Sequence, residues 1–426
     1  MGLRVLVVGG GGREHALVSG IAGSPRLEAL FCAPGNPGIA AEAEPVRVSP
    51  EDLEGLAALV EREDVDLTVV GPEAPLVSGL ADLLAARGRA VFGPAQAAAR
   101  LEGSKAFAKE IMEAAGVPTG RAAVFTMLNP ALAFLEEHGA PVVIKADGLA
   151  AGKGVVVATT RQEAEDALRA CLSERAFGDA GKTVLVEEYL EGEEASLLAL
   201  VSDGRVLPLA PAQDYKRALD GDQGPNTGGM GSYSPVPGVD AQMYDHIVHT
   251  IIRPTVAELA DRGISYRGVL YTGVILTADG PRVLEFNCRF GDPETQVLIP
   301  RLKSDLLDLL WATATGADLP ETAEWHPGVC VGVVIASRGY PASSSKGDAI
   351  EGVEAAAGLP DVKVYQAGTA CKEGRLVTAG GRVLVVAARG KDFATARERA
   401  YEGVGKISFP GMQWRTDIAQ RAAGRG

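Results

Sequence analysis

The first hundred residues alternate short apolar runs with amphipathic segments, and this alternation constrains the fold more than any other feature of the sequence. Residues 3–8 form a nearly continuous apolar run followed by four glycines. Similar runs at 27–33 and 67–70 end in glycine and proline, and a helical pattern at 51–62 separates them. Strands that alternate with helices form a parallel sheet covered on both faces, with the functional loops at the carboxyl ends of the strands. We therefore expect an N-terminal α/β domain over residues 1–102.

The pattern changes near residue 103, where a lysine-bearing helical stretch opens a second block. Within this block, Asp-Gly dipeptides at 203–204 and 279–280 each separate two apolar, β-branched runs, which is typical of tight antiparallel hairpins. A third block after Pro320 combines strand-like runs with one helical pattern and shows no catalytic cluster. We predict a multidomain α/β and α+β protein that ends in a mixed α/β domain. The expected domains are residues 1–102, 103–322 and 323–426.

Composition excludes several classes of protein. The chain has 426 residues, enough for about three domains. Its net charge of −14 argues against a main surface that holds DNA or RNA, and no apolar run approaches the roughly 18 residues of a membrane span. Five scattered cysteines lack the spacing of a zinc site or a disulfide framework, and the N-terminal apolar run is too short for a signal peptide. We therefore expect a cytoplasmic protein that binds neither nucleic acid nor membrane.

Four glycines at residues 9–12 follow the first apolar run, where a parallel sheet binds its ligands. Glycine lets backbone N–H groups approach an anion at a helix N-terminus, so a phosphate site assisted by Arg13 is one interpretation. The dinucleotide fingerprint G-x-G-x-x-G fails in both registers, because Glu14 or His15 stands at the third glycine position. A dinucleotide site and a purely structural tight turn are the other two interpretations of this Rossmann-like opening.

A second glycine loop, residues 145–154, follows a strand-like run and carries Lys145 and Lys153. Its glycines are Gly148, Gly152 and Gly154. The spacing differs from that of a Walker loop, which needs four residues between the first glycine and Gly-Lys. Since a strand rather than a helix follows, we expect a hairpin whose flexible tip folds over a triphosphate. The alternative is a solvated, lysine-rich hairpin, which would be costly to order without an anion.

The sharpest chemical signal is the stretch over residues 282–294, which reads RVLEFNCRFGDPE. Alternation along a strand sends Glu285, Asn287 and Arg289 to one face. The set expected on the opposite, core-facing side is Leu284, Phe286 and Cys288. A carboxylate and an amide oxygen two residues apart suit Mg²⁺, and the guanidinium beside them can neutralise a transferring phosphoryl group. The alternative is a polar ladder on an exposed strand.

Acidic residues gather at a strand end within residues 187–194. At such a position, backbone groups can pair with adenine, and a carboxylate can accept hydrogen bonds from ribose hydroxyls. An acidic loop surface explains the same residues almost as well, so both interpretations stay open.

Residues 224–231 form a long glycine-rich loop, GPNTGGMG, preceded by the charged segment DYKR at 214–217. The loop shows no regular helical or strand pattern. Irregular loops of this length within compact domains are usually functional, so we expect it to border a binding site.

Seven segments together resemble a known enzyme family. They are GGREHA, APGNPG, VGPEAPL, LEGSKAF, VIKADGLAAGKGV, GPNTGGMGSYSP and EFNCRFGDPETQ. Spread over nearly the whole chain, they are similar to the phosphoribosylamine–glycine ligases of purine biosynthesis, also called glycinamide ribonucleotide synthetases. RFGDPETQ, residues 289–296, is the diagnostic stretch of that family. The resemblance implies the ATP-grasp fold, with an ATP-grasp domain over 103–322 and a small lid subdomain over about 121–189.

The activity implied by this resemblance joins glycine to 5-phosphoribosylamine and cleaves ATP to ADP and phosphate. Glycine's carboxylate would attack the γ-phosphorus of ATP to form glycyl phosphate, and the amine of phosphoribosylamine would then displace phosphate. The implied ATP-binding residues are Lys105, Lys145, Gly148, Gly152, Lys153, Gly154, Glu187, Tyr189 and Glu194. The implied ligands of Mg²⁺ or Mn²⁺ are Glu285 and Asn287. The implied substrate-binding residues are Gly11, Gly12, Arg13, Pro72, Glu73, Asp214, Lys216, Asn226, Thr227, Gly228 and Gly229. The implied catalytic residues are Arg289, Lys145 and Asp292.

Other functions account for the sequence less well. Many members of the wider superfamily carry a further acidic metal ligand on the preceding strand, but residues 271–277 contain none, which leaves the number of ions open.

A Rossmann-type oxidoreductase would need cofactor-specificity residues that are absent, and a metal-free nucleotide sensor would not need the polar face at 285–289. The alternative that remains is another ATP-grasp carboxylate–amine ligase with a different acceptor. We expect a monomer that acts on small molecules.

Overall fold

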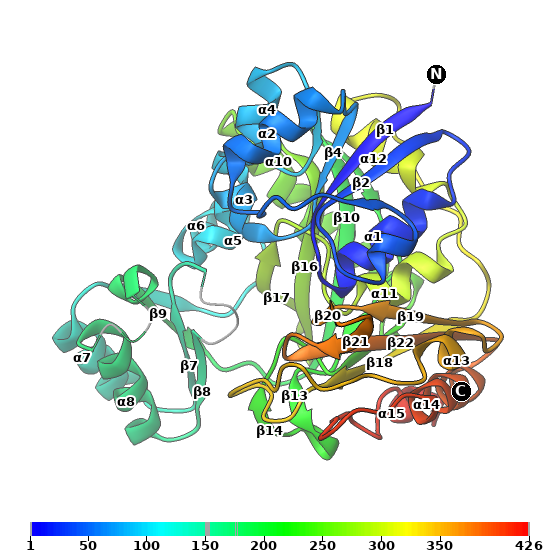
Figure 1. Cartoon of the computed structure of the whole chain (residues 1–426). Coiled ribbons are helices and arrows are strands. Elements are labelled where there is room, and N and C mark those ends of the chain that lie inside the picture. Colours follow the sequence, from blue (N-terminus) through cyan, green and yellow to red (C-terminus); the bar gives the residue numbers. More distant parts are fainter. Residues whose placement is uncertain (1, 150–153, 175, 177, 425–426) are drawn as a thin grey trace.

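The N-terminal unit contains the parallel sheet that the alternating pattern predicts (Figure 1). The computed structural model describes residues 2–149, 154–174, 176 and 178–424. The strand order is β3-β2-β1-β4-β5, and every pairing in it is parallel. The strands are β1 (Leu3–Gly9), β2 (Leu27–Pro34), β3 (Glu44–Pro45), β4 (Leu67–Val70) and β5 (Ala90–Phe92). The helices are α1 (Gly12–Ala22), η1 (Ile39–Ala41), α2 (Leu53–Arg62), α3 (Glu73–Val77), α4 (Leu80–Ala86) and α5 (Gln96–Gly103).

The central unit is built on an antiparallel sheet with the order β11-β10-β16-β17. Its strands are β10 (Glu193–Ser202), β11 (Arg205–Pro208), β16 (Arg267–Thr277) and β17 (Gly280–Asn287). Both predicted hairpins are present, and Asp203 and Gly204 have positive φ angles of 46° and 92°, as a tight turn requires. The helices of this unit are α6 (Lys105–Ala114), α9 (Ala241–Ile247), η4 (Val248–Ile252), α10 (Arg253–Asp261), α11 (Thr295–Leu298), η5 (Ile299–Arg301) and α12 (Leu306–Thr315).

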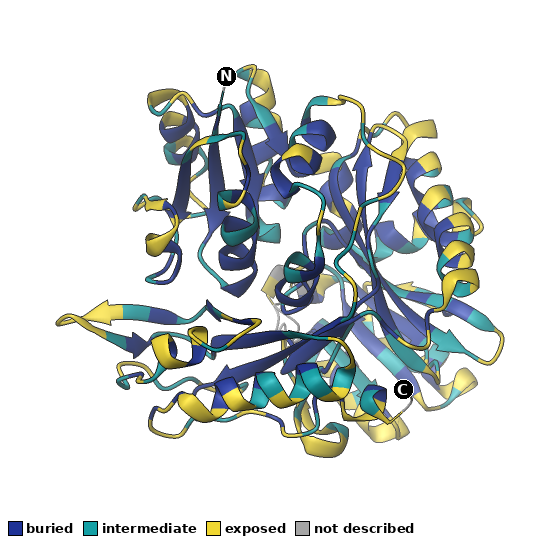
Figure 2. Ribbon diagram, turned by 90° about the vertical axis from the view of Figure 1, so that its right-hand side faces the viewer, coloured by how far each residue is buried: buried dark blue, intermediate teal, exposed yellow. Residues whose placement is uncertain are grey.

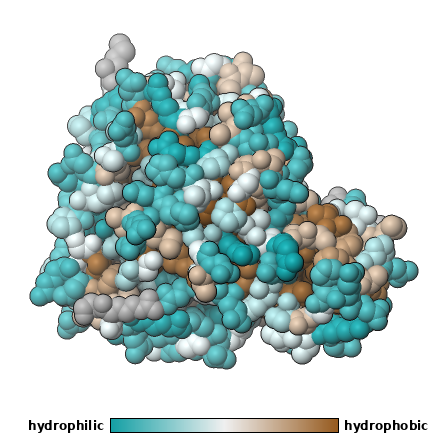
Figure 3. Space-filling model, turned by 180° about the vertical axis from the view of Figure 1, so that it is seen from behind, coloured by the Kyte–Doolittle hydropathy of each residue, from teal (hydrophilic) through white to brown (hydrophobic). Residues whose placement is uncertain are grey.

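A smaller lid unit between α6 and β10 has a hydrophobic core of its own and projects from the body of the molecule (Figures 1 and 3). Its sheet has the order β6-β9-β7-β8. The elements are β6 (Ala122–Phe125), α7 (Leu128–His138), β7 (Val142–Ala146), β8 (Val155–Ala158), α8 (Arg161–Leu172), η2 (Gly178–Lys182) and β9 (Val184–Glu188). Thr160 and Glu163 form a capping box at the start of α8. Val124 and Met127 are exposed apolar residues of this unit, whose surface is partly hydrophobic in Figure 3.

The C-terminal sheet takes strands from two blocks of the sequence. Its order is β12-β15-β18-β22-β19, and β12 and β15 come from the block before residue 322. The boundary expected there therefore does not separate two independent sheets. The elements of this region are β12 (Gln213–Asp214), β13 (Arg217–Leu219), η3 (Asp220–Asp222), β14 (Gln223–Asn226), β15 (Gly231–Ser234), β18 (Val329–Ala336), α13 (Val353–Ala357), β19 (Val362–Gln366), β20 (Thr369–Lys372), β21 (Arg375–Thr378), β22 (Arg382–Gly390), α14 (Phe393–Lys406) and α15 (Gln420–Ala423).

Burial follows these layers, because the strands are mostly buried and the helices expose their outer faces (Figure 2). Within the described part of the chain, no helix combines the length and the apolar character needed to cross a bilayer.

Arg415 ties the C-terminal segment to the β13–β14 hairpin, which leads into the glycine-rich loop. Its side chain is fully buried and lies 2.9 Å from a carboxylate oxygen of Asp222 and 2.6 Å from one of Asp417. It also donates a hydrogen bond of 3.2 Å to the carbonyl oxygen of Arg217. One buried guanidinium therefore holds the C-terminal segment against this hairpin.

We expect Arg415→Ala to lower the free energy of unfolding by about 3 kcal/mol, because the substitution removes the arginine partner of Asp417 and one of the two arginines that pair with Asp222. Urea unfolding would measure the loss. Arg87→Ala is the matched control, since Arg87 also pairs with two carboxylates, Glu54 and Glu61, but on the surface. Its loss should be much smaller, because solvent screens the charges of an exposed ion pair. Equal losses in the two variants would contradict the role of the buried guanidinium.

Candidate active site

Three lysines gather where lid strands β7 and β9 approach helix α6. The Nζ atoms of Lys145 and Lys109 lie 3.0 and 3.2 Å from the same carboxylate oxygen of Glu187. Lys105 donates a 3.0 Å hydrogen bond to the carbonyl oxygen of Gly148. Burial lowers the pKa values of Lys105 and Lys109, and nearby carboxylates partly offset this effect. The cluster is a cationic surface that can hold a polyphosphate.

Only some of the other residues predicted to bind ATP lie beside these lysines in the described part of the chain. Gly148 has a φ angle of 109°, a conformation that favours glycine, and the carbonyl oxygen of Gly154 accepts a hydrogen bond from the N–H of Ala146. Gly152 and Lys153 lie outside the described residues. Tyr189 is exposed. The Glu187 carboxylate is held by two lysines, and the residue lies in β9, which pairs with β6 on one side and β7 on the other.

A β-bulge in strand β17 changes which residues face the core. The register shifts between Gly273 and Val274 on the partner strand, so Leu284 becomes the extra residue. Leu284 is only partly buried, and Val283 takes its place in the core. The prediction that Leu284 faces the core is therefore wrong, whereas Phe286 and Cys288 do face it. The Leu284 carbonyl oxygen instead accepts a 3.0 Å hydrogen bond from Lys145.

Oxygen ligands for a divalent cation lie beyond the bulge. Arg289 Nη2 donates a long hydrogen bond of 3.4 Å to Asn287 Oδ1. Burial lowers the pKa of Lys105, and the nearby charge of Glu285 acts in the opposite direction and raises it. A carboxylate and an amide oxygen are donors that suit Mg²⁺ or Mn²⁺. The described residues contain no group of three or more His, Cys, Asp or Glu placed to hold a metal ion. Phosphate oxygens and water would therefore have to complete the coordination.

Arg289 is held between two carboxylates from the N-terminal unit. Its Nε lies 3.3 Å from Glu73 Oε2, and its Nη2 lies 3.1 Å from Glu102 Oε1. Burial opposes the charge of Arg289, but Glu102 and Glu73 hold its pKa above the ordinary value. Glu102 also accepts a 2.7 Å hydrogen bond from the N–H of Cys288. Glu102 was not among the predicted site residues, and its only signal in the sequence is a glutamate within an otherwise apolar helix face.

We expect Glu102→Gln to lower kcat about tenfold, because the amide keeps a hydrogen bond to Cys288 but loses the charge that orients Arg289. Steady-state ADP release would measure kcat, and a thermal melt would show that the fold persists. Glu110→Gln is the control, since Glu110 pairs with Arg262 on the exposed side of α6. If the two variants had the same kcat, the Glu102 carboxylate would have no part in orienting Arg289.

The N-terminal glycine loop surrounds a carboxylate. The N–H of Gly11 donates a 2.6 Å hydrogen bond to Glu14 Oε2, so this group is not available to a phosphate in this conformation. Arg13 is buried; its Nε lies 2.6 Å from Glu14, and its Nη1 donates to the carbonyl oxygen of Phe290. A Cβ atom at Gly9 would lie 2.6 Å from Glu14 Cγ, so glycine is required there. Arg13 thus contacts the RFGDPETQ segment through Phe290. Glu73, which follows Pro72 in the sequence, contacts Arg289 of the same segment.

Lys216 links a residue predicted to bind ATP with residues predicted to bind the substrates. Its Nζ lies 2.9 Å from Asp214 Oδ1 and 2.5 Å from Glu194 Oε2. Burial works against the charge of Lys216, yet the two carboxylates hold its pKa well above the ordinary value. Lys216 in turn lowers the pKa of Glu194, while burial raises that of Asp214. Glu194, which was predicted to bind the nucleotide, therefore forms one cluster with Asp214 and Lys216, which were predicted to bind the substrates.

A buried hydrogen-bonded chain lies behind this cluster. Tyr271 donates a 2.9 Å hydrogen bond to Glu294 Oε1, and Ser196 Oγ lies 2.7 Å from the Tyr271 hydroxyl. Burial and the charge of Asp214 raise the pKa of Glu294 to about 7. Sequence reasoning missed Tyr271 and Ser196, because nothing distinguishes them from other strand residues.

The glycine-rich loop continues from this cluster. Thr227 binds the carbonyl oxygen of Lys216 through both its N–H and its hydroxyl, at 2.7 and 2.8 Å. Asn226 is exposed, and the N–H of Gly229 donates a 3.0 Å hydrogen bond to the Thr227 hydroxyl. The loop therefore connects the Lys216 cluster with the next segment of the site.

Asp292 lies where the central and C-terminal units meet. Its Oδ1 accepts a 2.7 Å hydrogen bond from Gln296, and its Oδ2 lies 3.3 Å from Arg382 Nη2. Arg382 also donates to the carbonyl oxygen of Gly228. The third block, which shows no catalytic cluster in the sequence, therefore contributes a side chain to this site.

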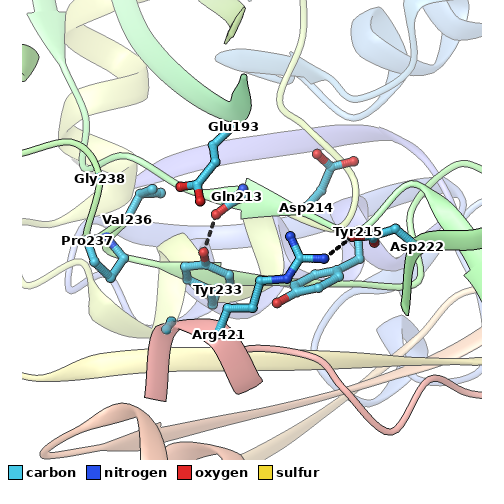
Figure 4. Close-up of a pocket in the computed structure, with 11 residues that line it drawn as sticks. Glu193, Gln213, Asp214, Tyr215, Asp222, Tyr233, Val236, Pro237, Gly238 and Arg421 are labelled. Carbon is cyan, nitrogen blue, oxygen red and sulfur yellow. Dashed lines mark hydrogen bonds and ion pairs between the residues drawn. The ribbon is translucent and has the colours of Figure 1, made fainter. Parts of the chain in front are cut away.

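A cavity of about 60 Å³ lies beside the Lys216 cluster (Figure 4). Asp214 is part of its wall, Tyr233 donates a hydrogen bond to Gln213, and Arg421 of helix α15 pairs with Asp222. Its volume holds only a few water molecules. The cavity is therefore too small to hold a nucleotide.

Comparison with known proteins identifies the family. Family models described as the N domain, the ATP-grasp (A) domain and the C domain of phosphoribosylglycinamide synthetase match residues 3–102, 103–295 and 330–421. Phosphoribosylamine–glycine ligases of Vibrio parahaemolyticus and Pseudomonas aeruginosa are 49% and 50% identical to the chain, each over 99% of both sequences.

Solved structures agree with these matches. The crystal structure of phosphoribosylamine–glycine ligase from Thermotoga maritima is 34% identical, with a TM-score of 0.84 over 97% of this chain and 100% of that one. A biotin carboxylase from Campylobacter jejuni, 17% identical with a TM-score of 0.76 over 96% of this chain and 93% of its own, shares the fold. Three domain matches in sequence order and full-length relatives near 50% identity show that the chain belongs to the phosphoribosylglycinamide synthetase family, whose central domain is an ATP-grasp domain.

Proposed function

We propose that this protein joins glycine to 5-phosphoribosylamine and converts ATP to ADP and phosphate. The observation that carries the proposal is the convergence of Lys105, Lys145 and Arg289 on the side of the central sheet that also presents Glu285 and Asn287. The full-length relatives that bear this activity in their names support the choice of substrates.

The reaction has two steps. A carboxylate oxygen of glycine attacks the γ-phosphorus of ATP, the bond to the β–γ bridging oxygen breaks, and ADP leaves. The amine nitrogen of phosphoribosylamine then attacks the acyl carbon of glycyl phosphate, phosphate leaves, and the nitrogen loses a proton to give the amide. Arg289 faces the charge that builds on the transferred group.

The nucleotide site consists of residues from the lid and from the central unit. Lys105 and Lys145 hold the phosphates, and the other residues proposed to bind ATP there are Gly148, Gly152, Lys153 and Gly154. Backbone groups of Glu187 and Tyr189 contact adenine, and Glu194 contacts ribose. Glu285 and Asn287 hold Mg²⁺ or Mn²⁺, which when bound supplies charge neutralisation for the phosphates.

The acceptor and glycine sites lie at the junction of the three units. Gly11, Gly12 and Arg13 approach it from the first loop, and Pro72 and Glu73 from the start of α3. The residues that approach from the central unit are Asp214, Lys216, Asn226, Thr227, Gly228, Gly229 and Asp292. We propose that the protein acts as a monomer. Five free cysteines suit the cytoplasm, and the net charge of −14 suits small-molecule partners rather than nucleic acid.

ADP release tests the proposal directly. Measured with Mg-ATP, glycine and phosphoribosylamine together, and with each omitted in turn, release should be sustained only when both substrates are present. The same ADP release without phosphoribosylamine would favour a different acceptor, as in another ATP-grasp carboxylate–amine ligase.

A further inference from the structure

Two side chains of the C-terminal unit bind the backbone of Gly228, one at its N–H and one at its carbonyl oxygen. Its N–H donates a 2.9 Å hydrogen bond to the hydroxyl of Tyr340, and its carbonyl oxygen accepts one from Arg382 Nη1. Tyr340 packs against Gly381, the residue before Arg382, so the two side chains come from one surface. Gly228 itself is exposed, so its orientation depends on these partners rather than on burial.

Arg382 binds a second segment with the same guanidinium. Its Nη1 donates a 2.7 Å hydrogen bond to the carbonyl oxygen of Asp292, and its Nη2 lies 3.3 Å from that residue's carboxylate. Burial would raise the pKa of the Asp292 carboxyl, but Arg382, followed by Arg13, holds it below the ordinary value. The glycine-rich loop and the RFGDPETQ segment are therefore fixed to each other through one residue of the third unit.

The adjacent glycines Gly228 and Gly229 permit this close approach. A Cβ atom at Gly228 would lie 3.1 Å from Arg382 Cζ, and one at Gly229 would lie 2.5 Å from Pro293 Cδ. Gly229 also has a φ angle of 108°, which side-chain-bearing residues rarely adopt. Thr227, the residue before Gly228, is anchored to the backbone carbonyl oxygen of Lys216, so the Gly228 backbone is linked directly to the segment that carries the Lys216 cluster.

We propose that Tyr340 and Arg382 are positioning residues for the acceptor: they fix the Gly228 peptide and Asp292 in the orientation that places the amine of phosphoribosylamine against the acyl carbon of glycyl phosphate. This inference rests on the proposed function. It makes the C-terminal unit a working part of the acceptor site. A displaced amine reacts more slowly, so water hydrolyses more of the acyl phosphate and ADP is formed without product.

The experiment compares Arg382→Ala, Arg382→Lys and Tyr340→Phe with the parent protein. The KM values for phosphoribosylamine and for ATP and the ratio of ADP to ligated product are measured, together with a thermal melt. Arg399→Ala and Tyr401→Phe are matched controls in the same unit. Arg399 binds one carboxylate and one carbonyl oxygen, and the Tyr401 hydroxyl donates to the carbonyl oxygen of Arg415 and accepts from the N–H of Ile418, all away from the loop.

We expect Arg382→Ala to lower kcat/KM for phosphoribosylamine about tenfold or more, to leave the KM for ATP within about twofold, and to raise the ratio of ADP to product above one. Arg382→Lys should recover part of the loss, because the ammonium keeps the charge opposite Asp292 but not both hydrogen bonds. Tyr340→Phe should show the same pattern at a few-fold level, and both controls should match the parent.

Equal changes in the KM values for ATP and phosphoribosylamine, or changes that the controls share, would overturn the proposal in favour of a general structural role. Unchanged acceptor kinetics in Arg382→Lys and Tyr340→Phe would overturn it even if Arg382→Ala failed to fold. If the parent protein released ADP without any need for phosphoribosylamine, the proposed function itself would be wrong, and this result is obtained before any variant is compared.

Discussion

Arg289→Ala is expected to lower kcat about a thousandfold, which corresponds to about 4 kcal/mol of transition-state stabilisation. The guanidinium is already charged and held between Glu73 and Glu102, so it needs little reorganisation when negative charge develops on the transferred phosphoryl group. Single-turnover ADP formation with saturating Mg-ATP and glycine would measure the first chemical step directly.

Arg289→Lys separates charge from geometry. The ammonium keeps the positive charge but cannot contact both carboxylates in the fork geometry of a guanidinium, so we expect an intermediate loss of about a hundredfold. It also avoids leaving Glu102 buried without a cationic partner, which makes it the safer variant for folding. A kcat within about threefold of the parent in both variants, with the fold intact, would exclude Arg289 from the phosphoryl-transfer step.

Glu285→Gln is expected to lower kcat by at least about a hundredfold at a fixed Mg²⁺ concentration and to raise the Mg²⁺ concentration needed for half-maximal activity. The amide is nearly isosteric with the carboxylate but neutral, so the loss reflects coordination rather than packing. Titrations of activity with Mg²⁺ and with Mn²⁺ would measure the shift, and a thermal melt would report on the fold.

Glu324→Gln provides the control for this variant, because Glu324 is exposed and pairs with Lys303 away from the site. Its metal titration should match that of the parent. If the titration of Glu285→Gln also matched, the carboxylate would not be a metal ligand and the coordination would have to rest on other groups.

Much of the architecture is predictable from local pattern. The runs at 3–8 and 67–70 are strands of a parallel sheet, because a strand covered on both faces must be apolar along nearly its whole length. The Asp-Gly dipeptides mark hairpins, since their residues tolerate positive φ angles. These rules depend only on neighbouring residues.

Leu284 shows where local pattern fails. Strict alternation predicts that it faces the core, but the bulge adds one residue to strand β17 without a counterpart on β16. A bulge depends on how the partner strand pairs, which the sequence of one strand does not contain. The polar face nevertheless survives beyond the bulge, because alternation resumes there and Asn287 stays beside Arg289.

By itself, the sequence determined the strand and helix pattern, the family, and the residue types available for phosphate and metal chemistry, because each of these depends on short segments and their spacing. Only the tertiary structure decided which charges meet. Glu102 contacts Arg289 across 187 positions of the chain, and Arg382 contacts Gly228 across 154. The physical reason is that such pairs form when separate domains pack together, and a charge gains a specific partner only once packing has removed it from water.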